Sequence, residues 1–186
     1  AYVGTLGVGG RQLGLSGPAV TEHVGLEGVA CTRVENACAA SGTALRQAVL
    51  AVRAGAADVA LAGGVEVMTD ASGDRTRYWL GVSGETEWAR MSGTTFAGVY
   101  AQMADAHMAE HGTTREQLSR VAVKNHANGA NNDHAHLGFE CSLEDAMAAD
   151  TVADPLNLYD CCPTSDGASA VLVASESAAR ELTDDP

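Results

Sequence analysis

The sequence predicts an α/β fold with parallel strands, and two observations carry that prediction. First, an apolar segment of strand length at 29–35, an Ala-, Leu- and Val-rich segment of helix length at 39–54 and a second apolar segment at 59–67 follow one another. This order is typical of a βαβ unit, whose strands are parallel and joined by a right-handed crossover. Second, apolar residues make up 46% of the chain but aromatic residues only 4%, which indicates close packing of helices on a sheet through small side chains.

The segments before this unit are short. Residues 1–6 predict a buried strand that enters a Gly-rich loop at 7–17. Pro18 stands where proline is favoured, in the first turn of a helix expected over 18–24. Gly55 follows the helix of the βαβ unit and is expected to end it.

A less regular region follows the unit. Residues 70–94 are rich in Gly, Ser and Thr and predict an irregular excursion. A helix is expected over 95–111, with Gly112 as its cap. The T-x-x-Q pattern at 114–117 is a capping box for a further helix that runs to about residue 128.

The last third of the chain alternates loops with short elements. A polar loop is expected over 129–142, one or two helical turns over 142–149 and a loop over 156–166. A strand over 168–174 and the start of a helix over 176–182 complete the pattern. The sequence contains no internal repeat and no low-complexity linker.

The charge of the chain excludes one class of function. Its net charge is −13, and ten of its 11 basic residues are Arg. Such a surface repels phosphate backbones, so a nucleic-acid partner is not expected. The acidity indicates either adaptation to high salt, which we favour, or the composition of a GC-rich genome.

The cysteines and the hydropathy indicate a cytoplasmic protein. The five cysteines are odd in number and form no CxxC pair, which is typical neither of a disulfide framework nor of a zinc site. We therefore expect a reducing compartment and no metal. No apolar run reaches the roughly 20 residues that span a bilayer. The first residues have neither an initiator Met nor a charged n-region, so the chain is expected to begin within a longer protein.

One cysteine lies at an expected junction between a strand and the helix that follows it. Cys38 stands at that junction, and its neighbours are small: Ala37, Ala39, Ala40, Ser41 and Gly42. A helix start favours the thiolate and offers N–H groups to an oxyanion, and small neighbours admit a long thioester. Free cysteines are also among the most buried residues, so these features alone leave a second interpretation open, a packed and inert thiol.

A family resemblance favours the nucleophile. The segment 34–48, read as V-E-N-A-C-A-A-S-G-T-A-L-R-Q-A, and the A-L-A-G-G-V-E-V-M segment at 60–68 resemble the thiolase family, most closely the sterol-carrier-protein-x (SCP-2) type. The C-P-T-S-D-G-A-S-A segment at 162–170 resembles the strand that closes the family's N-terminal half. K-N-H at 124–126 and N-G at 128–129 resemble a helix of the SCP-2 type. One departure is Ala40, which makes the elbow C-A-A-S-G in place of C-A-S-G.

This resemblance implies a particular fold and domain organisation. Thiolases have two similar halves, each a mixed five-stranded sheet with helices, stacked as αβαβα layers. Residues 1–186 resemble the N-terminal half without its opening strand and helix, and they include an inserted loop region at about 70–156. The C-terminal half is expected to follow Pro186 and to supply a His and, in most members, a second Cys. None of the six histidines here lies in a motif that matches this activating His.

The resemblance also implies an activity in lipid metabolism. Cys38 is the implied catalytic residue of an acyl-CoA thiolase, which cleaves 3-ketoacyl-CoA or runs the reverse condensation through an acyl-cysteine. Acyl-CoA and coenzyme A are the implied substrates, no other cofactor is implied, and a homodimer or homotetramer is expected. The alternatives are a catalytically silent subunit and an SCP-2-like retro-aldolase, either of which would work with a zinc-ribbon/OB-fold partner. Without the second half, we expect the 186 residues to be inactive and to fold poorly because apolar surface is exposed.

Other residues receive more modest interpretations. His134 and His136 are expected to be solvated rather than metal-bound, and Cys161–Cys162 to be small packing residues rather than a redox pair. Gly63–Gly64 are expected to allow a close backbone approach near the elbow, and Glu66 to make structural hydrogen bonds below it. The aromatic residues between 79 and 100 are expected either to line an acyl channel or to form loop core or a subunit contact; they are Trp79, Trp88, Phe96 and Tyr100.

Overall fold

A computed structural model of the protein describes residues 1–10, 14, 16–84 and 92–185. Trp88 therefore lies outside the described residues, as does part of the Gly-rich loop. The chain divides into two compact units: unit 1 comprises Ala1–Trp79 and Asp166–Pro186, and unit 2 comprises Leu80–Ser165. Within the described ranges, no helix is both long enough and apolar enough to cross a membrane.

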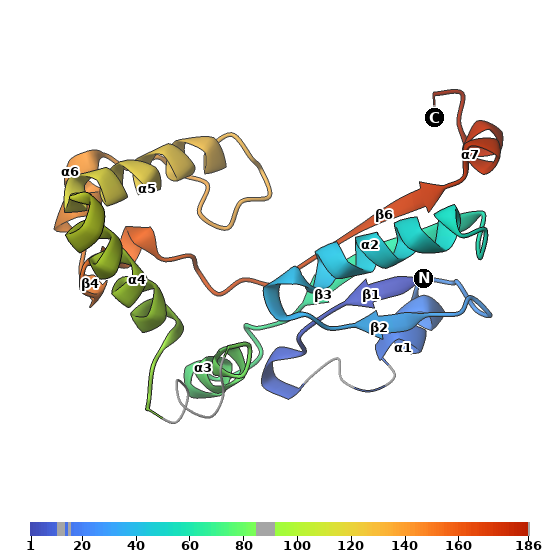
Figure 1. Cartoon of the computed structure of the whole chain (residues 1–186), viewed down its shortest axis with the longest axis horizontal. Helices are drawn as coiled ribbons and strands as arrows, with labels where there is room; N and C mark the ends of the chain where they lie inside the picture. The colour runs from blue at the N-terminus through green and yellow to red at the C-terminus, as the bar shows by residue number, and fades with distance from the viewer. Residues whose placement is uncertain (11–13, 15, 85–91, 186) are drawn as a thin grey trace. The chain divides into compact units, whose positions relative to one another are not determined.

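Unit 1 contains a mixed four-stranded sheet in the order β2-β1-β3-β6 (Figure 1). Its strands are β1 (Tyr2–Gly4), β2 (Thr32–Val34), β3 (Val59–Glu66) and β6 (Gly167–Ala174). β1 runs parallel to both β2 and β3, whereas β6 runs antiparallel to β3 along its whole length. This is the predicted α/β fold with a mixed sheet and a βαβ crossover, although the sheet of the described residues has four strands where five were expected.

Most helices of unit 1 lie where the sequence predicts them. The helices α1 (Ser16–His23), α2 (Ala40–Arg53) and α7 (Glu176–Leu182) match predicted helices. Two 3-10 turns were not predicted: η1 (Val8–Gly10) lies in the expected Gly-rich loop, and η2 (Ala37–Ala39) lies at the expected strand–helix junction. The excursion expected to be irregular at 70–94 instead contains α3 (Gly73–Gly81), so that prediction is wrong for these residues. Arg, Tyr and Leu within the segment favour a helix, and their signal was obscured by the flanking Gly and Ser residues.

Helix α2 covers one face of the sheet through alanine side chains. Ala40, Ala44 and Ala48 are buried at a spacing of four residues, which places them on a single face of the helix. Ala48 packs with Ala60 and Ala62 of β3 in the core of the unit. Because methyl groups fill this interface, the helix can approach the strands closely, as the aromatic-poor composition predicts.

The outer surfaces of unit 1 expose large apolar side chains. On α2, Leu45 and Leu50 are each 42% exposed, and on β6 Leu172 is 66% exposed. Exposed patches of this kind are usual where a protein surface meets another layer or subunit. Exposed apolar surface was expected without assignment to particular residues, and these side chains contribute to it.

Unit 2 is formed mainly by helices. They are α4 (Phe96–His111), α5 (Arg115–Gly129) and α6 (Leu143–Ala148), followed by the strands β4 (Thr151–Ala153) and β5 (Leu156–Asn157) and the 3-10 turn η3 (Leu158–Asp160). Gly112 ends α4 in the left-handed conformation, at φ 70°. The capping box at Thr114 and Gln117 is present, and both predictions are confirmed.

The sequence prediction misses the β4–β5 hairpin. Residues 156–166 were expected to be loop but begin with β5 and η3, so that prediction is wrong at these residues. The two strands pair over only a few residues, with a register irregularity between Thr151 and Ala153. Strands this short lack the alternating apolar pattern by which a strand is predicted.

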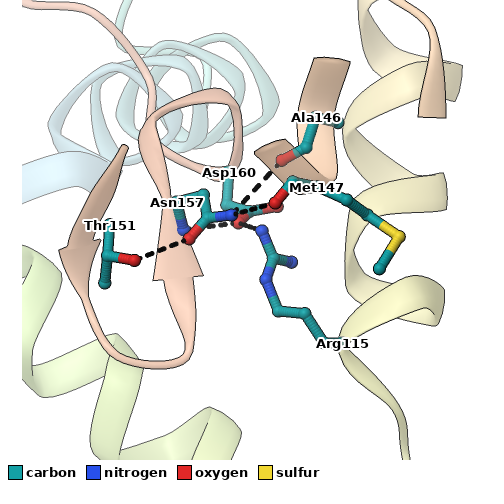
Figure 2. Close-up of polar contacts among 6 residues, drawn as sticks. All are labelled: Arg115, Ala146, Met147, Thr151, Asn157 and Asp160. Carbon is teal, nitrogen blue, oxygen red and sulfur yellow. Dashed lines mark hydrogen bonds and ion pairs between the residues drawn. The ribbon is translucent and has the colours of Figure 1, made fainter. Parts of the chain in front are cut away.

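A buried polar network holds the hairpin to the helices of unit 2 (Figure 2). Arg115 at the start of α5 pairs with Asp160 at 2.6 Å, and the two side chains are only 22% and 7% exposed. The same Asp160 oxygen accepts a hydrogen bond from the Asn157 backbone N–H at 2.7 Å. The Asn157 amide donates to the carbonyls of Ala146 and Met147 at the end of α6. These contacts connect α5 and the end of α6 to the segment of β5 and η3 that carries Asn157 and Asp160.

Candidate active site

The site is built at the junction between β2 and α2. After β2 ends at Val34, the chain turns through Glu35 and Asn36 and enters the 3-10 turn that holds Cys38. Ala37 has a φ of 46°, the only positive value at a non-glycine among the residues described by the structure. An alanine in this left-handed region costs about 1–2 kcal/mol, so neighbouring contacts must hold it there.

Two sets of hydrogen bonds hold the elbow in this conformation. The backbone N–H of Ala37 donates to Oε1 of Glu35 at 2.5 Å. On the helix side, Nδ2 of Asn36 donates to Oγ1 of Thr43 at 3.2 Å, and the Thr43 hydroxyl donates to the Ala39 carbonyl at 3.0 Å. Glu35, Asn36 and Thr43 therefore connect the residues before and after Cys38. Sequence reasoning did not identify Glu35 or Thr43, although polar side chains that flank a cysteine in an Ala-rich segment are a usable signal.

The first turn of α2 lies directly on two glycines of the sheet. A Cβ atom built on Gly4 would lie 2.6 Å from the carbonyl carbon of Ala40, and one on Gly64 would overlap the Ser41 side chain. Both contacts are shorter than a Cβ atom can make, so glycine is required at both positions while the helix stays in place. The close approach predicted at Gly63–Gly64 is thus confirmed, and Gly64 is the residue that permits it.

Glu66 fixes the loop beyond β1. Its carboxylate accepts hydrogen bonds from the backbone N–H groups of Leu6, Gly7 and Val8 at 2.8–3.4 Å and from the Thr5 hydroxyl at 3.3 Å. Successive N–H groups that converge in this way form a concave anion site, here occupied by the protein's own side chain. The structural role predicted for Glu66 is confirmed.

Asp166 fixes the turn after β3 in the same manner. It accepts hydrogen bonds from the Thr69 hydroxyl and from the backbone N–H groups of Met68 and Thr69. These bonds, with the Thr69 hydroxyl first, lower the pKa of Asp166 below its ordinary value of 3.8. Since Glu66 pairs with Gly167 in the sheet, the A-G-G-x-E segment and the S-D-G-A segment are adjacent in space. The elbow rests on Gly64, so these three sequence motifs meet in unit 1.

Cys38 differs from three of the other cysteines in its surroundings. Burial raises the pKa of Cys31, Cys141 and Cys161, in Cys161 with further contributions from the nearby charges of Asp160 and Cys162. A thiol with a raised pKa is protonated at neutral pH and reacts slowly. Cys38 is exposed, as is Cys162. The exposed thiol at the helix start is thus accessible to a reagent, whereas an inert packing cysteine would be buried.

Most backbone N–H groups around Cys38 already have acceptors. The N–H of Ala37 donates to Oε1 of Glu35, that of Ala39 to the Asn36 carbonyl and that of Ala40 to the Ala37 carbonyl. Within the described residues, the N–H of Cys38 itself has no such acceptor. A donor of this kind can stabilise negative charge on the oxygen of an attacked carbonyl.

Unit 2 carries a separate pocket of about 400 Å³. Residues of α5, β5 and the segment after η3 line it, among them Leu118, His126, Tyr159, Cys161 and Cys162. His126 is buried in a cluster with the rings of Phe139 and Tyr159, and its Nδ1 lies 3.1 Å from the Phe139 carbonyl. No role is predicted for His126 from the sequence, although its position in the K-N-H segment is a usable signal.

The loop histidines His134 and His136 do not form part of a three-ligand metal site within the described residues. Within the described part of the chain, no group of three or more His, Cys, Asp and Glu side chains is placed to hold a metal ion. His136 lies 2.5 Å from the Ser165 hydroxyl through Nδ1, and the backbone N–H of His134 donates to the Asn132 side chain. Both loop histidines thus have local hydrogen-bonding roles.

Comparison with known proteins relates this geometry to a family. The profile of the thiolase N-terminal domain matches residues 17–177. The chain is 46% identical over 167 residues to the acetyl-CoA acetyltransferase of Methanothermobacter thermautotrophicus, covering 90% of this chain and 43% of that protein. It is 34% identical to human sterol carrier protein 2, covering 85% of this chain and 30% of that protein.

One more curated relative and one solved structure extend the comparison. The benzoylsuccinyl-CoA thiolase subunit BbsB of Thauera aromatica is 36% identical, with 98% of this chain and 46% of that protein covered. Among solved structures, the Ltp2-ChsH2(DUF35) aldolase superposes with a TM-score of 0.73 at 28% identity, covering 97% of this chain and 45% of that one. The chain thus spans less than half the length of the curated relatives it matches. With its α/β half-fold and its matched motifs, the chain belongs to the thiolase family.

Proposed function

We propose that this chain carries the acyl-accepting nucleophile of an acyl-CoA thiolase, and that Cys38 is that nucleophile. The observation that carries the proposal is the exposed Cys38 thiol on a left-handed elbow, directly before the start of α2. The similarity to proteins named acetyl-CoA acetyltransferase supports an acyl-CoA substrate.

The proposed chemistry has two steps. The Cys38 thiolate attacks the keto carbon of a 3-ketoacyl-CoA, the bond between that carbon and C2 breaks, and its electron pair leaves with C2, which is protonated to give acetyl-CoA. A second molecule of coenzyme A then loses its thiol proton to a base and takes the acyl group from Cys38. In the condensing direction, Cys38 is acetylated first. The acid and base of both steps are expected outside this chain, in a C-terminal half.

Covalent labelling tests the proposal. The full-length protein is incubated with isotope-labelled acetyl-CoA, and the labelled peptide is identified by mass spectrometry. We expect label on Cys38, released by hydroxylamine as a thioester would be, and no label in Cys38→Ser. The matched control is Cys162→Ser, which removes the other exposed thiol described here and should keep the label. Equal labelling of wild type and Cys38→Ser would overturn the proposal.

A second candidate function is a retro-aldolase that works with a partner protein. It is favoured by one finding, the similarity to the Ltp2-ChsH2(DUF35) aldolase. A retro-aldol cleavage of a 3-hydroxyacyl-CoA does not require an acyl-cysteine. If Cys38→Ser abolishes labelling but leaves cleavage of such a substrate intact, the second candidate replaces the first.

A further inference from the structure

Two histidines share one face of α4 at its last turn. His107 and His111 are four residues apart, a spacing that makes side chains neighbours on a helix surface. Their ring centroids are 4.6 Å apart, with the planes inclined at 60°. Both residues are exposed, so a small solute can reach the two rings.

A hydrogen bond engages one ring nitrogen of His107 and leaves the other outside this contact. Nδ1 of His107 lies 2.9 Å from Oγ1 of Thr113, which follows the helix. When Nδ1–H donates to this oxygen, the lone pair of the ring is on Nε2. A donor bond from the other ring nitrogen is the usual companion of a metal-binding histidine, because it fixes both the tautomer and the ring orientation.

The surroundings of the pair also favour a cation. The last turn of a helix carries partial negative charge on its terminal carbonyl groups. Oε1 of Glu110 lies 3.9 Å from Nε2 of His111, which places a carboxylate beside the pair. The whole chain carries a net charge of −13, so the general field attracts cations as well.

We propose that His107 and His111 form a two-nitrogen site for a divalent late transition metal ion such as Cu²⁺, Ni²⁺ or Zn²⁺. Imidazole nitrogens suit these ions, whereas Mg²⁺ and Ca²⁺ take oxygen ligands. Metal–nitrogen bonds of about 2.0–2.1 Å place two ligand nitrogens about 3 Å apart, which rings at this centroid distance can reach. Water completes the coordination, since the described residues include no group of three suitable ligands.

Metal titration of the full-length protein tests this site. The exposed thiols are first removed by Cys38→Ser/Cys162→Ser, because thiolates bind the same ions. After treatment with EDTA and dialysis, NiCl₂, ZnCl₂ and MgCl₂ are titrated by calorimetry at neutral pH. We expect one Ni²⁺ or Zn²⁺ per chain and no heat of binding with Mg²⁺.

Single substitutions then locate the ion. His107→Ala and His111→Ala should each weaken Ni²⁺ binding by about tenfold or more, and Thr113→Val should weaken it less, as the loss of an outer hydrogen bond does. The control is His134→Ala/His136→Ala, which removes the two loop histidines and should leave the affinity unchanged. Circular dichroism checks that each variant keeps its helices. Unchanged Ni²⁺ affinity in His111→Ala, or loss of binding in the control, would overturn the proposal.

Discussion

The two units of this chain are stabilised in different ways. In unit 1, α2 packs on the sheet through alanine and glycine, and the core contains few large side chains. In unit 2, an ion pair and an amide network tie α5, α6 and the β4–β5 hairpin together. The first arrangement depends on the absence of side-chain atoms, and the second on the presence of particular polar atoms.

This difference bears on where a reactive residue can be displayed. Close contact between α2 and the ends of β1 and β3 holds the start of the helix in one place without covering it. Cys38 can therefore be fixed in position and still be exposed. The polar network of unit 2 is itself buried and supports its own turn, so it serves the architecture of that unit.

The largest expected effect comes from breaking the ion pair of unit 2. Asp160→Ala leaves the Arg115 guanidinium buried without its partner, and the free energy of unfolding of unit 2 should fall by about 3–5 kcal/mol. Hydrogen exchange of the α5 amides measures this loss. The control is Glu116→Gln, which breaks the exposed pair with Arg120 and should cost about 0.5 kcal/mol or less. Equal losses in both variants would contradict the importance of burial.

The next effect tests the contact between helix and sheet in unit 1. Gly64→Ala forces a methyl group into the Ser41 side chain and should destabilise unit 1 by about 2–3 kcal/mol. Gly63→Ala is the matched control in the same strand, because its new Cβ would lie 3.5 Å from the Ser169 carbonyl oxygen, an ordinary contact. Chemical denaturation of both variants gives the comparison. The contact model is wrong if Gly63→Ala is the more damaging change.

A smaller effect is expected at the elbow itself. Glu35→Ala removes the acceptor of the Ala37 N–H, a hydrogen bond of about 1 kcal/mol. If the whole of this energy is lost in the transition state, the rate at which Cys38 is acylated should fall about fivefold. Glu35→Gln keeps an acceptor oxygen of nearly the same reach and should restore most of that rate. Single-turnover labelling with acetyl-CoA measures both variants. If the two variants are equally slow, the acylation rate depends on the charge of Glu35 and not on its hydrogen bond to the Ala37 N–H.

The smallest expected effect is on the stability of the folded protein at low pH. Hydrogen bonds to the charged form lower the pKa of Asp166 in the folded protein, so its contribution is present above the ordinary value of 3.8 and is lost as the pH falls through the lower folded value. Ser142 acts on Asp145 of unit 2 in the same direction. Denaturation midpoints measured from neutral pH down to about pH 3 should fall more steeply at the acid end in wild type than in Asp166→Asn. If the denaturation midpoints of wild type and Asp166→Asn fall equally steeply, Asp166 does not contribute to the loss of stability in acid.

Much of the local structure could be predicted because it obeys short-range rules. The βαβ unit follows from apolar periodicity, and the ends of α4 and α5 follow from Gly112 and from the Thr114–Gln117 box. The position of Cys38 at a strand–helix junction was also predicted.

The sequence alone therefore determined the fold class, the helix ends and the place of the elbow, since each depends on residues within a few positions of one another. Only the tertiary structure decided that Glu66 occupies the loop of residues 6–8, that β6 pairs antiparallel with β3 and that Asn157 bonds to the end of α6. The physical reason is distance along the chain. These contacts join segments about ten to a hundred residues apart, and they form when the packed core brings the partners together rather than through any local preference.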